Sequence, residues 1–275
     1  MRITLIFFIL HSCFAFCQEK IAQLPDELHE SSALVMYEDV LISLNDSGNE
    51  NKLYVFDKKG ELLNQCMIEN ARNVDWEALV YDGDSMLYIG DIGNNQNIRT
   101  DQKIYGVPIH SVISDSAVEA MTIAFSYPDQ EHFPPDEANL YYDAETLLFK
   151  NDSLFIFTKN RTVPFDGIVK VYGLSTNAGS QTPKRYSDLQ LEPTSWMEDC
   201  ATDGAIYGDK LFLMTYAKVY VFNWSKDGFH RTETIYSFDF FTQKEGIAVD
   251  EKFIYITEEN EERLSDAAHL YKMKR

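Results

Sequence analysis

The stretch "NVDWEALVYDGDSMLYIGDIGNN" runs from Asn73 to Asn95 and contains the pattern that decides the fold. A short apolar run begins at Glu77, and a turn separates it from a second run, "MLYIGD". Short runs rich in Tyr, Val and Ile, bounded by Gly, Asp and Asn, are typical of β-strands. The stretch therefore predicts a β-hairpin with a carboxylate at the start of its first strand.

The same pattern occurs five times along the chain. Its first residues are Ser32, Glu77, Glu145, Thr202 and Glu245. From each of them to the middle of the second strand the gap is ten or eleven residues. A third run follows in every unit, as in "KLYVFD" and "KVYVFNW", and a fourth follows in four units, as in "ELLNQCMI". Such self-similarity at a regular period is the signature of a repeat architecture.

Five units of four antiparallel strands predict an all-β fold, a single β-propeller domain over residues 18–275. The fifth unit lacks a fourth strand, and "EKIAQLP" near residue 20 can supply it. Pairing of the N- and C-terminal strands would then close the ring and remove exposed sheet edges. Six blades would need another unit within the 68 residues between Glu77 and Glu145, where we find only the loop "PDQEHFPPDEANLYYD".

Residues 1–17, "MRITLIFFILHSCFAFC", have the layout of a secretory signal peptide: one positive charge, an apolar run and small residues at its end. Cleavage between Cys17 and Gln18 predicts a periplasmic or extracellular protein. The alternative is a lipoprotein acylated at Cys17, which the bulky Phe16 disfavours. No later segment is long and apolar enough to predict a transmembrane helix.

The charge of the chain is strongly negative, −20, and becomes −21 without Arg2. This excess argues against nucleic acid and anionic membranes as partners, because both require a positive surface. Cys66 and Cys200 are the cysteines beyond residue 17, and their spacing fits neither a disulfide framework nor a metal motif. We expect two free thiols, with a single bridge between them as the alternative.

The first residue of each inner strand of a propeller lies at one rim of the central channel. We therefore expect the five repeat residues, with their three carboxylates, to converge on the axis. Converging carboxylates repel one another unless they are protonated or neutralised by a cation. Ca²⁺ suits oxygen ligands, and the absence of His and Cys among the five disfavours Zn and Cu. The predicted metal ligands are Ser32, Glu77, Glu145, Thr202 and Glu245.

Loops on the same face carry the second predicted set of functional residues. The candidate ligand-binding residues are Asp46, Asp91, Asn94, Arg99, Lys159, Arg161 and Glu258. Basic residues are scarce in this chain, so the three in this set, Arg99, Lys159 and Arg161, could hold an anion beside the metal ion. The alternative is that Gly, Asn and Asp simply form turns there and that the basic groups make surface pairs of little energetic value.

Two resemblances follow from these motifs. The segments "NDSGN", "DWEAL" and "YIGDIGNN" resemble secreted β-propeller proteins of Bacteroidetes that carry no assigned activity. The repeat residues are also similar to the calcium-activated nucleotidase (apyrase) family, five-bladed propellers with a central Ca²⁺, whose corresponding positions read Ser, Glu, Glu, Ser, Glu. In the "DDRTG" loop of that family, Asp46 matches the second acid, whereas Ser47 stands where the phosphate-contacting arginine would be.

The sequence thus leaves two functions open. The first is an exported propeller with a central Ca²⁺ and a polar face that binds a glycan or a protein. The second is a Ca²⁺-dependent hydrolase of phosphoanhydrides or phosphoesters, with Glu77 or Glu145 as the catalytic base. The missing arginine favours the first. We find no nucleophile elbow, phosphate-binding glycine loop or histidine metal motif.

Overall fold

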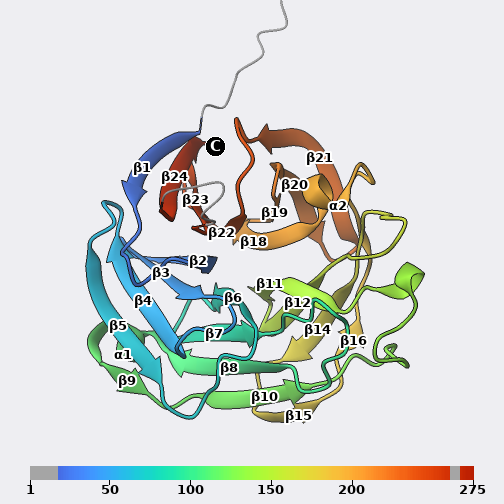
Figure 1. Cartoon of the computed structure of the whole chain (residues 1–275), viewed down its shortest axis with the longest axis horizontal. Coiled ribbons are helices and arrows are strands. Elements are labelled where there is room, and N and C mark those ends of the chain that lie inside the picture. Colours follow the sequence, from blue (N-terminus) through green and yellow to red (C-terminus); the bar gives the residue numbers. More distant parts are fainter. Residues whose placement is uncertain (1–17, 261–266) are drawn as a thin grey trace, which may run out of the picture.

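The computed structural model describes residues 18–260 and 267–275, and these residues form the predicted five-bladed β-propeller (Figure 1). The signal peptide predicted over residues 1–17 lies outside the described residues. Each blade is a four-stranded antiparallel sheet whose first strand lies nearest the axis. No helix within the described part of the chain is long and apolar enough to cross a membrane.

The strands follow the predicted repeat closely. Blade 1 contains β2 (Ser31–Tyr37), β3 (Val40–Asn45), β4 (Lys52–Asp57) and β5 (Leu62–Ile68). Blade 2 contains β6 (Trp76–Tyr81), β7 (Met86–Asp91), β8 (Lys103–Pro108) and β10 (Met121–Phe125). Blade 3 contains β11 (Asp143–Lys150), β12 (Ser153–Lys159), β14 (Val171–Ser175) and β16 (Lys184–Arg185). Blade 4 contains β18 (Ala201–Tyr207), β19 (Lys210–Thr215), β20 (Lys218–Ser225) and β21 (Gly228–Ser237).

Blade 5 closes the ring. It contains β22 (Lys244–Val249), β23 (Phe253–Glu258), β24 (His269–Lys274) and β1 (Glu19–Gln23). The N-terminal strand β1 pairs antiparallel with the C-terminal strand β24, so that Lys20 lies opposite Tyr271. In Figure 1 the two strands lie side by side at the ends of the colour scale. The predicted closure of the ring by the two ends of the described chain is therefore confirmed.

Short elements join the blades outside this repeat. The two-residue strand β9 (Ala117–Val118) adds in parallel to β5, and β15 (Gly179–Gln181) adds in parallel to β10. The strands β13 (Ile168–Val169) and β17 (Leu189–Gln190) pair with each other. The helices are short: α1 (Ile109–Ser114), η1 (Glu137–Asn139) and α2 (Trp196–Asp199).

The hydrophobic core lies between the blades, in five clusters that correspond to the five blade interfaces. Successive side chains of a strand point to opposite faces of its sheet. In β3, for example, Ile42 and Leu44 pack toward blade 2, whereas Leu41 packs toward blade 5. Because both faces of each blade are buried, the strands read as nearly continuous apolar runs rather than as strict alternations.

Each inner strand carries a β-bulge at the same place. The register of β6 against β7, for example, passes from Trp76 opposite Asp91 directly to Ala78 opposite Gly90, and so leaves Glu77 unpaired. The residues skipped in the five blades are Ser32, Glu77, Glu145, Thr202 and Glu245. These are the five predicted repeat residues. A bulge redirects a side chain out of the regular ladder, and here it does so next to the axis.

The two ends of the central channel differ in character. The end away from the bulges opens into a cavity of about 320 Å³ lined mainly by apolar side chains, among them Leu34, Leu79 and Ile247. The bulged end is polar.

Cys66 and Cys200 are both buried as free thiols, as predicted, so no bridge joins them. Burial raises the pKa of Cys66 to about 11 and that of Cys200 to about 12.

Candidate functional site

A chain of hydrogen bonds crosses the polar end of the channel and links the inner strands. The Ser32 hydroxyl lies 2.7 Å from Glu77 Oε2 and 3.3 Å from Glu245 Oε2, so its single proton is shared between two carboxylates. The Tyr216 hydroxyl donates to Glu245 Oε1 at 2.8 Å. All four side chains are buried. Residues of blades 1, 2, 4 and 5 thus meet at the axis.

Lys159, from the end of β12, brings blade 3 into this chain. Its ammonium donates to Glu145 Oε1, with which it forms an ion pair, and to the Tyr216 hydroxyl at 2.8 Å. Glu245 Oε1 lies 3.9 Å away. Burial alone would lower the pKa of Lys159, but Glu145 and its other neighbours outweigh burial and raise that pKa above its ordinary value. The lysine therefore supplies a fixed positive charge to one half of the ring.

The other half of the ring is acidic, and among the described residues its one ion pair with a basic group is that of Asp75 Oδ2 with the Arg99 guanidinium, 4.0 Å away. One carboxylate oxygen from each of Asp46, Asp75 and Glu77 lies within 4.8 Å of the others. Burial raises the pKa of Asp46 to about 6. Burial, with the charges of Asp46 and Asp143, raises the pKa of Asp75 to about 7. The pKa of Glu77 is raised by burial first, then by Glu145 and Asp46. We call these three residues the acidic triad.

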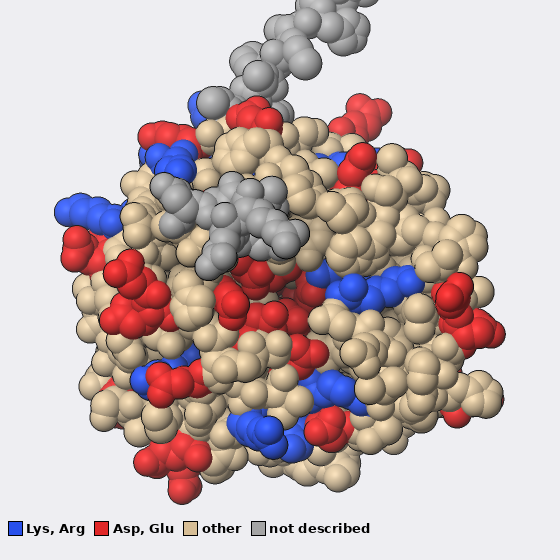
Figure 2. All heavy atoms as spheres, in the orientation of Figure 1, with Lys and Arg blue, Asp and Glu red and all other residues tan. Residues whose placement is uncertain are grey.

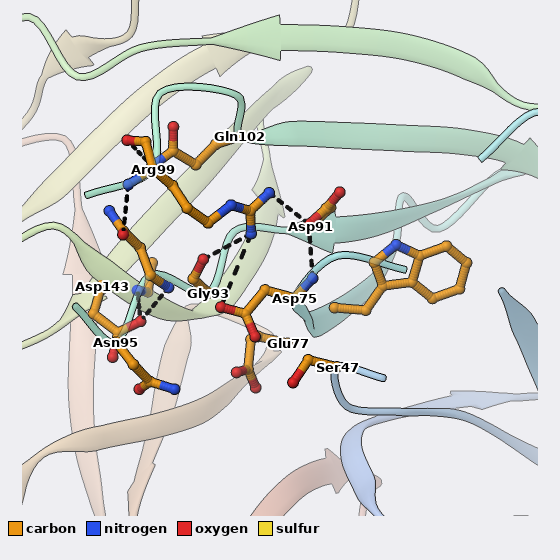
Figure 3. Close-up of polar contacts among 12 residues, drawn as sticks. Ser47, Asp75, Glu77, Asp91, Gly93, Asn95, Arg99, Gln102 and Asp143 are labelled. Atoms are coloured by element: carbon orange, nitrogen blue, oxygen red, sulfur yellow. Dashed lines mark hydrogen bonds and ion pairs between the residues drawn. The ribbon is translucent and has the colours of Figure 1, made fainter. Parts of the chain in front are cut away.

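The loop after β7 holds Asp75, one member of the acidic triad, in place, as Figure 3 shows. The Arg99 guanidinium donates to Asp91 Oδ1 at 2.8 Å and to the Gly93 carbonyl at 2.7 Å, and it lies 4.0 Å from Asp75 Oδ2. Asp91 in turn accepts a hydrogen bond from the Asp75 backbone N–H at 3.1 Å. A side-chain carbon on Gly93 would lie 2.5 Å from Asp75 Cγ, so only glycine lets the loop pass this close to the carboxylate.

A cavity of about 230 Å³ opens beside the acidic triad. It is lined by Asp46, Glu77, Asn95, Glu145, Lys159, Arg161, Trp196, Tyr216, Gln243 and Glu245. In the space-filling view, Asp and Glu side chains gather at the centre of this face, with Lys and Arg side chains beside them (Figure 2). The Arg161 guanidinium forms an ion pair with Asp143 and lies 5.0 Å from the centre of the Trp196 ring. The cavity thus combines carboxylates, two cationic groups and aromatic rings.

Several buried polar atoms around the cavity have no hydrogen-bond partner within the described residues. They include Glu145 Oε2, Trp196 Nε1 and Thr202 Oγ1. Burying a polar group without a partner costs about 1–3 kcal/mol, so native proteins usually satisfy such groups with a ligand, an ion or water. The presence of an acceptor and a donor in one cavity favours a polar ligand.

The predicted site residues fall into two groups. Asp46, Lys159 and Arg161 line the cavity, as do three of the predicted metal ligands, Glu77, Glu145 and Glu245. Four predicted ligand-binding residues do not line it: Asp91, Asn94, Arg99 and Glu258. The first three fasten the loop after β7, where the Asn94 side chain accepts from the backbone N–H groups of Ile98 and Arg99. Glu258 accepts from Thr242 and Tyr271. A binding role for these four stays a prediction.

The predicted site residues did not include Asp75 of the acidic triad, nor four residues that line the cavity: Asn95, Trp196, Tyr216 and Gln243. Asp75 could have been found, because it stands two residues before Glu77 in the distinctive "DWEAL" segment. Tyr216 directly follows the second strand of its unit, and Lys159 and Asp91 are the last residues of the second strands of blades 3 and 2. Trp196 comes from α2 and Gln243 from the loop after β21, and neither has an equivalent in the other repeats.

The residues present would hold a cation better at the acidic triad, on one side of the channel, than on the channel axis itself. The Lys159 ammonium already stands between Glu145 and Glu245, where a centrally bound ion would need those carboxylates. The oxygens of the acidic triad fit Ca²⁺, since ligands at the usual Ca–O distance of about 2.4 Å lie at most roughly 5 Å apart.

The fold is shared with solved propeller structures at very low sequence identity. A glutaminyl cyclase of Myxococcus xanthus superposes with a TM-score of 0.55 at 10% identity, over 94% of this chain and 97% of that one. An aldose sugar dehydrogenase of Streptomyces coelicolor, in its PQQ-bound form, gives 0.51 at 8% identity, over 94% and 97%. A luciferin-regenerating enzyme gives 0.50 at 9% identity, over 94% and 95%.

These similarities define the class of protein, a five-bladed β-propeller whose structural neighbours include enzymes. No protein-family profile matches the sequence, and no curated protein is similar to it. At such low identity the structural neighbours show the fold alone, because one fold supports many functions.

Proposed function

We propose that this protein is an exported ligand-binding propeller. It holds Ca²⁺ at the acidic triad of Asp46, Asp75 and Glu77, and it takes a polar part of a glycan or protein into the adjoining cavity. The observation that carries the proposal is the convergence of three carboxylate oxygens within 4.8 Å, whose one ion pair with a basic group among the described residues is the 4.0 Å contact between Arg99 and Asp75. Export rests on the signal-peptide pattern of residues 1–17.

The raised pKa values support a cation at this place. Three carboxylates that resist ionisation together would each lose their proton readily beside a divalent ion, because the opposite charge favours the ionised form. Ser32 connects the triad to Glu245 through Glu77, so an ion held there would also tie blades 1, 2 and 5 together. Binding of the ion would then raise the free energy of unfolding of the protein.

Calcium binding is tested by thermal unfolding of the full chain in Ca²⁺ and in EGTA. Binding to the folded state at about 100 times Kd stabilises by roughly 2.7 kcal/mol, which corresponds to a Tm rise of about 5–10 °C. We expect Asp75→Asn and Glu77→Gln to abolish the rise. Asp84→Asn is the matched control, because it removes an exposed carboxylate at the opposite end of the same hairpin. Equal Tm values in both buffers would contradict the proposal.

The second candidate is a Ca²⁺-dependent hydrolase of phosphoanhydrides or phosphoesters, as the apyrase resemblance implies. Lys159 and Arg161 face the carboxylates across the cavity and favour it, since they could hold a phosphate. The cation would neutralise phosphate charge, and Glu77 or Glu145 could accept the proton of the attacking water. Arg99 is less suited than these two residues to hold a phosphate, because it already forms ion pairs with Asp91 and Asp101. An assay for hydrolysis of nucleoside di- and triphosphates separates the two candidate functions. If the protein hydrolyses neither in Ca²⁺, the binding function remains.

A further inference from the structure

The large exposed apolar side chains are concentrated on the face that carries the cavity. Within the described residues, six of the eight lie in loops that join second to third strands or lead into inner strands, and all these loops return to the bulged end. They are Ile98, Phe133, Val163, Met197, Phe240 and Phe241, with exposed fractions of 41–60%. Leu63 and Tyr186 lie instead in or beside the outer strands β5 and β16. We call the six the apolar rim.

An aromatic path connects the apolar rim to the cavity. The ring of Phe241 lies 6.0 Å from that of Tyr216, which lies 5.9 Å from that of Trp196. Tyr216 and Trp196 line the cavity, and the Arg161 guanidinium covers the Trp196 ring. Exposed apolar groups around a polar depression mark interaction sites in soluble proteins, because isolated apolar residues scatter rather than collect on one face.

The charge of the cavity determines which group would enter it. Among the described residues, four carboxyl groups line it, from Asp46, Glu77, Glu145 and Glu245, against the two basic side chains Lys159 and Arg161. Both basic groups already have acidic partners, Glu145 and Asp143. The surplus is negative, as is the chain as a whole at −20. A positively charged group is therefore complementary, and the field of the protein would steer it inward.

We infer that this face binds an extended polypeptide segment in which one Lys or Arg enters the cavity and its apolar neighbours lie on the apolar rim. The inference rests on the proposed binding function and changes it in two respects: the ligand is a protein rather than a glycan, and it shares Asp46 and Glu77 with the ion instead of binding beside it. Ile98, Val163 and Met197 offer no side-chain groups that could satisfy sugar hydroxyls, and burying those hydroxyls unpaired would be unfavourable. A cavity of about 230 Å³ has room for one side chain but not for a folded element.

The bound side chain would approach Asp46 and Glu77, which the acidic triad also uses for Ca²⁺. We therefore expect peptide and ion to compete, so that peptides bind more tightly in EGTA than in Ca²⁺. Failure of the calcium proposal would leave peptide binding equal in both buffers. Failure of the present inference would leave a calcium-dependent Tm without peptide binding, so the two failures are distinguishable.

The test is selection of random peptides of about 12 residues, displayed on phage, against the full chain in EGTA. We expect selected sequences to contain Lys or Arg flanked by apolar residues. A selected peptide, synthesised and labelled, should bind Val163→Ser/Met197→Ser at least fivefold more weakly, a change typical of a contributing interface residue. Glu77→Gln should weaken it similarly. Leu63→Ser is the control, an equally exposed apolar residue away from the rim, and should bind normally.

Three outcomes would overturn the inference. They are selection without enrichment of basic residues, enrichment of acidic residues, and equal affinity of the rim variant and Leu63→Ser. Binding to immobilised glycans by the same protein, lost in the rim variant, would point to the other ligand class. Unfolding temperatures of each variant show that a weaker affinity does not result from a misfolded protein.

Discussion

At the scale of single residues, buried negative charge is neutralised in different ways on the two sides of the central channel. Near Glu145 the lysine ammonium neutralises buried negative charge, whereas near Glu77 burial and the neighbouring carboxylates raise the pKa and so favour the protonated form. The sequence predicted the five bulge residues because they recur at one position of a repeat. It could not predict that Lys159 is the counter-ion of Glu145. That ion pair joins two strands, and it depends on side-chain directions that the repeat pattern does not indicate.

The raised pKa of Asp75 predicts a specific pH dependence in the absence of Ca²⁺. The pKa is about 7 in the folded protein against 3.8 ordinarily, so the folded state binds more protons between these values. Its contribution to stability is therefore largest below about pH 4 and declines as the pH rises to about 7. In EGTA, the stability of Asp75→Asn relative to wild type should increase over that range and then level off.

Urea unfolding at several pH values measures this difference. The Asp84→Asn protein should follow the wild-type curve, because its carboxylate is exposed at the far end of the hairpin. Parallel curves for Asp75→Asn and wild type would show that Asp75 titrates normally. Added Ca²⁺ should flatten the wild-type curve, since the ion replaces the protons.

At the scale of elements, strands were easier to predict than the loops between them. Apolar runs mark strands because both faces of every blade are buried between neighbours. The bulges were not predicted, since an extra residue in one strand leaves no mark in composition. The loop after β7 was predicted to bind a ligand, yet its Asn94 and Arg99 bind their own backbone and Asp91. Such contacts depend on a chain path that a single sequence does not reveal.

Gly93 gives this loop its close approach to the acidic triad, so Gly93→Ala should disturb the site. The added carbon would lie 2.5 Å from Asp75 Cγ and 2.8 Å from Glu77 Cγ. We expect a loss of stability of about 1–3 kcal/mol, as for other overpacked positions, and loss of the calcium-induced Tm rise. Thermal unfolding in Ca²⁺ and in EGTA measures both effects.

Gly173→Ala is the matched control for this substitution. Its added carbon would meet the Phe155 ring at 3.4 Å, an ordinary contact, and it lies in β14 of blade 3. It should keep the full response to calcium. A Gly93→Ala protein that kept the same response would mean that the loop does not define the cation site.

At the scale of the whole molecule, closure of the ring depends on one strand pairing, that of β1 with β24. Leu24 adds a backbone hydrogen bond to Ala268 at 2.9 Å and is buried. The repeat predicted this closure because the fifth unit lacked its own fourth strand. Solved propellers share this fold at about 10% identity, and because one fold supports many functions, the architecture alone does not determine what the protein does.

A chain that begins at Pro25 lacks β1 and should leave the edge of β24 open. We expect a lower Tm and self-association, because an unpaired edge strand can pair with another chain. Size-exclusion chromatography and thermal unfolding measure these effects. Glu19→Ala keeps β1 and removes only an exposed ion pair with Lys272, so it should behave as wild type. A monomeric, equally stable truncated protein would show that β1 is dispensable.

The pairing of β1 with β24 also has a consequence for biosynthesis. Glu19 leaves the ribosome 250 residues before His269, so blade 5 cannot be completed until all the strands between them have been synthesised. Earlier blades can form locally, but the ring stays open until the last strand arrives, and contacts this distant in sequence form slowly. The pairing that closes the ring would thus form among the last steps of folding.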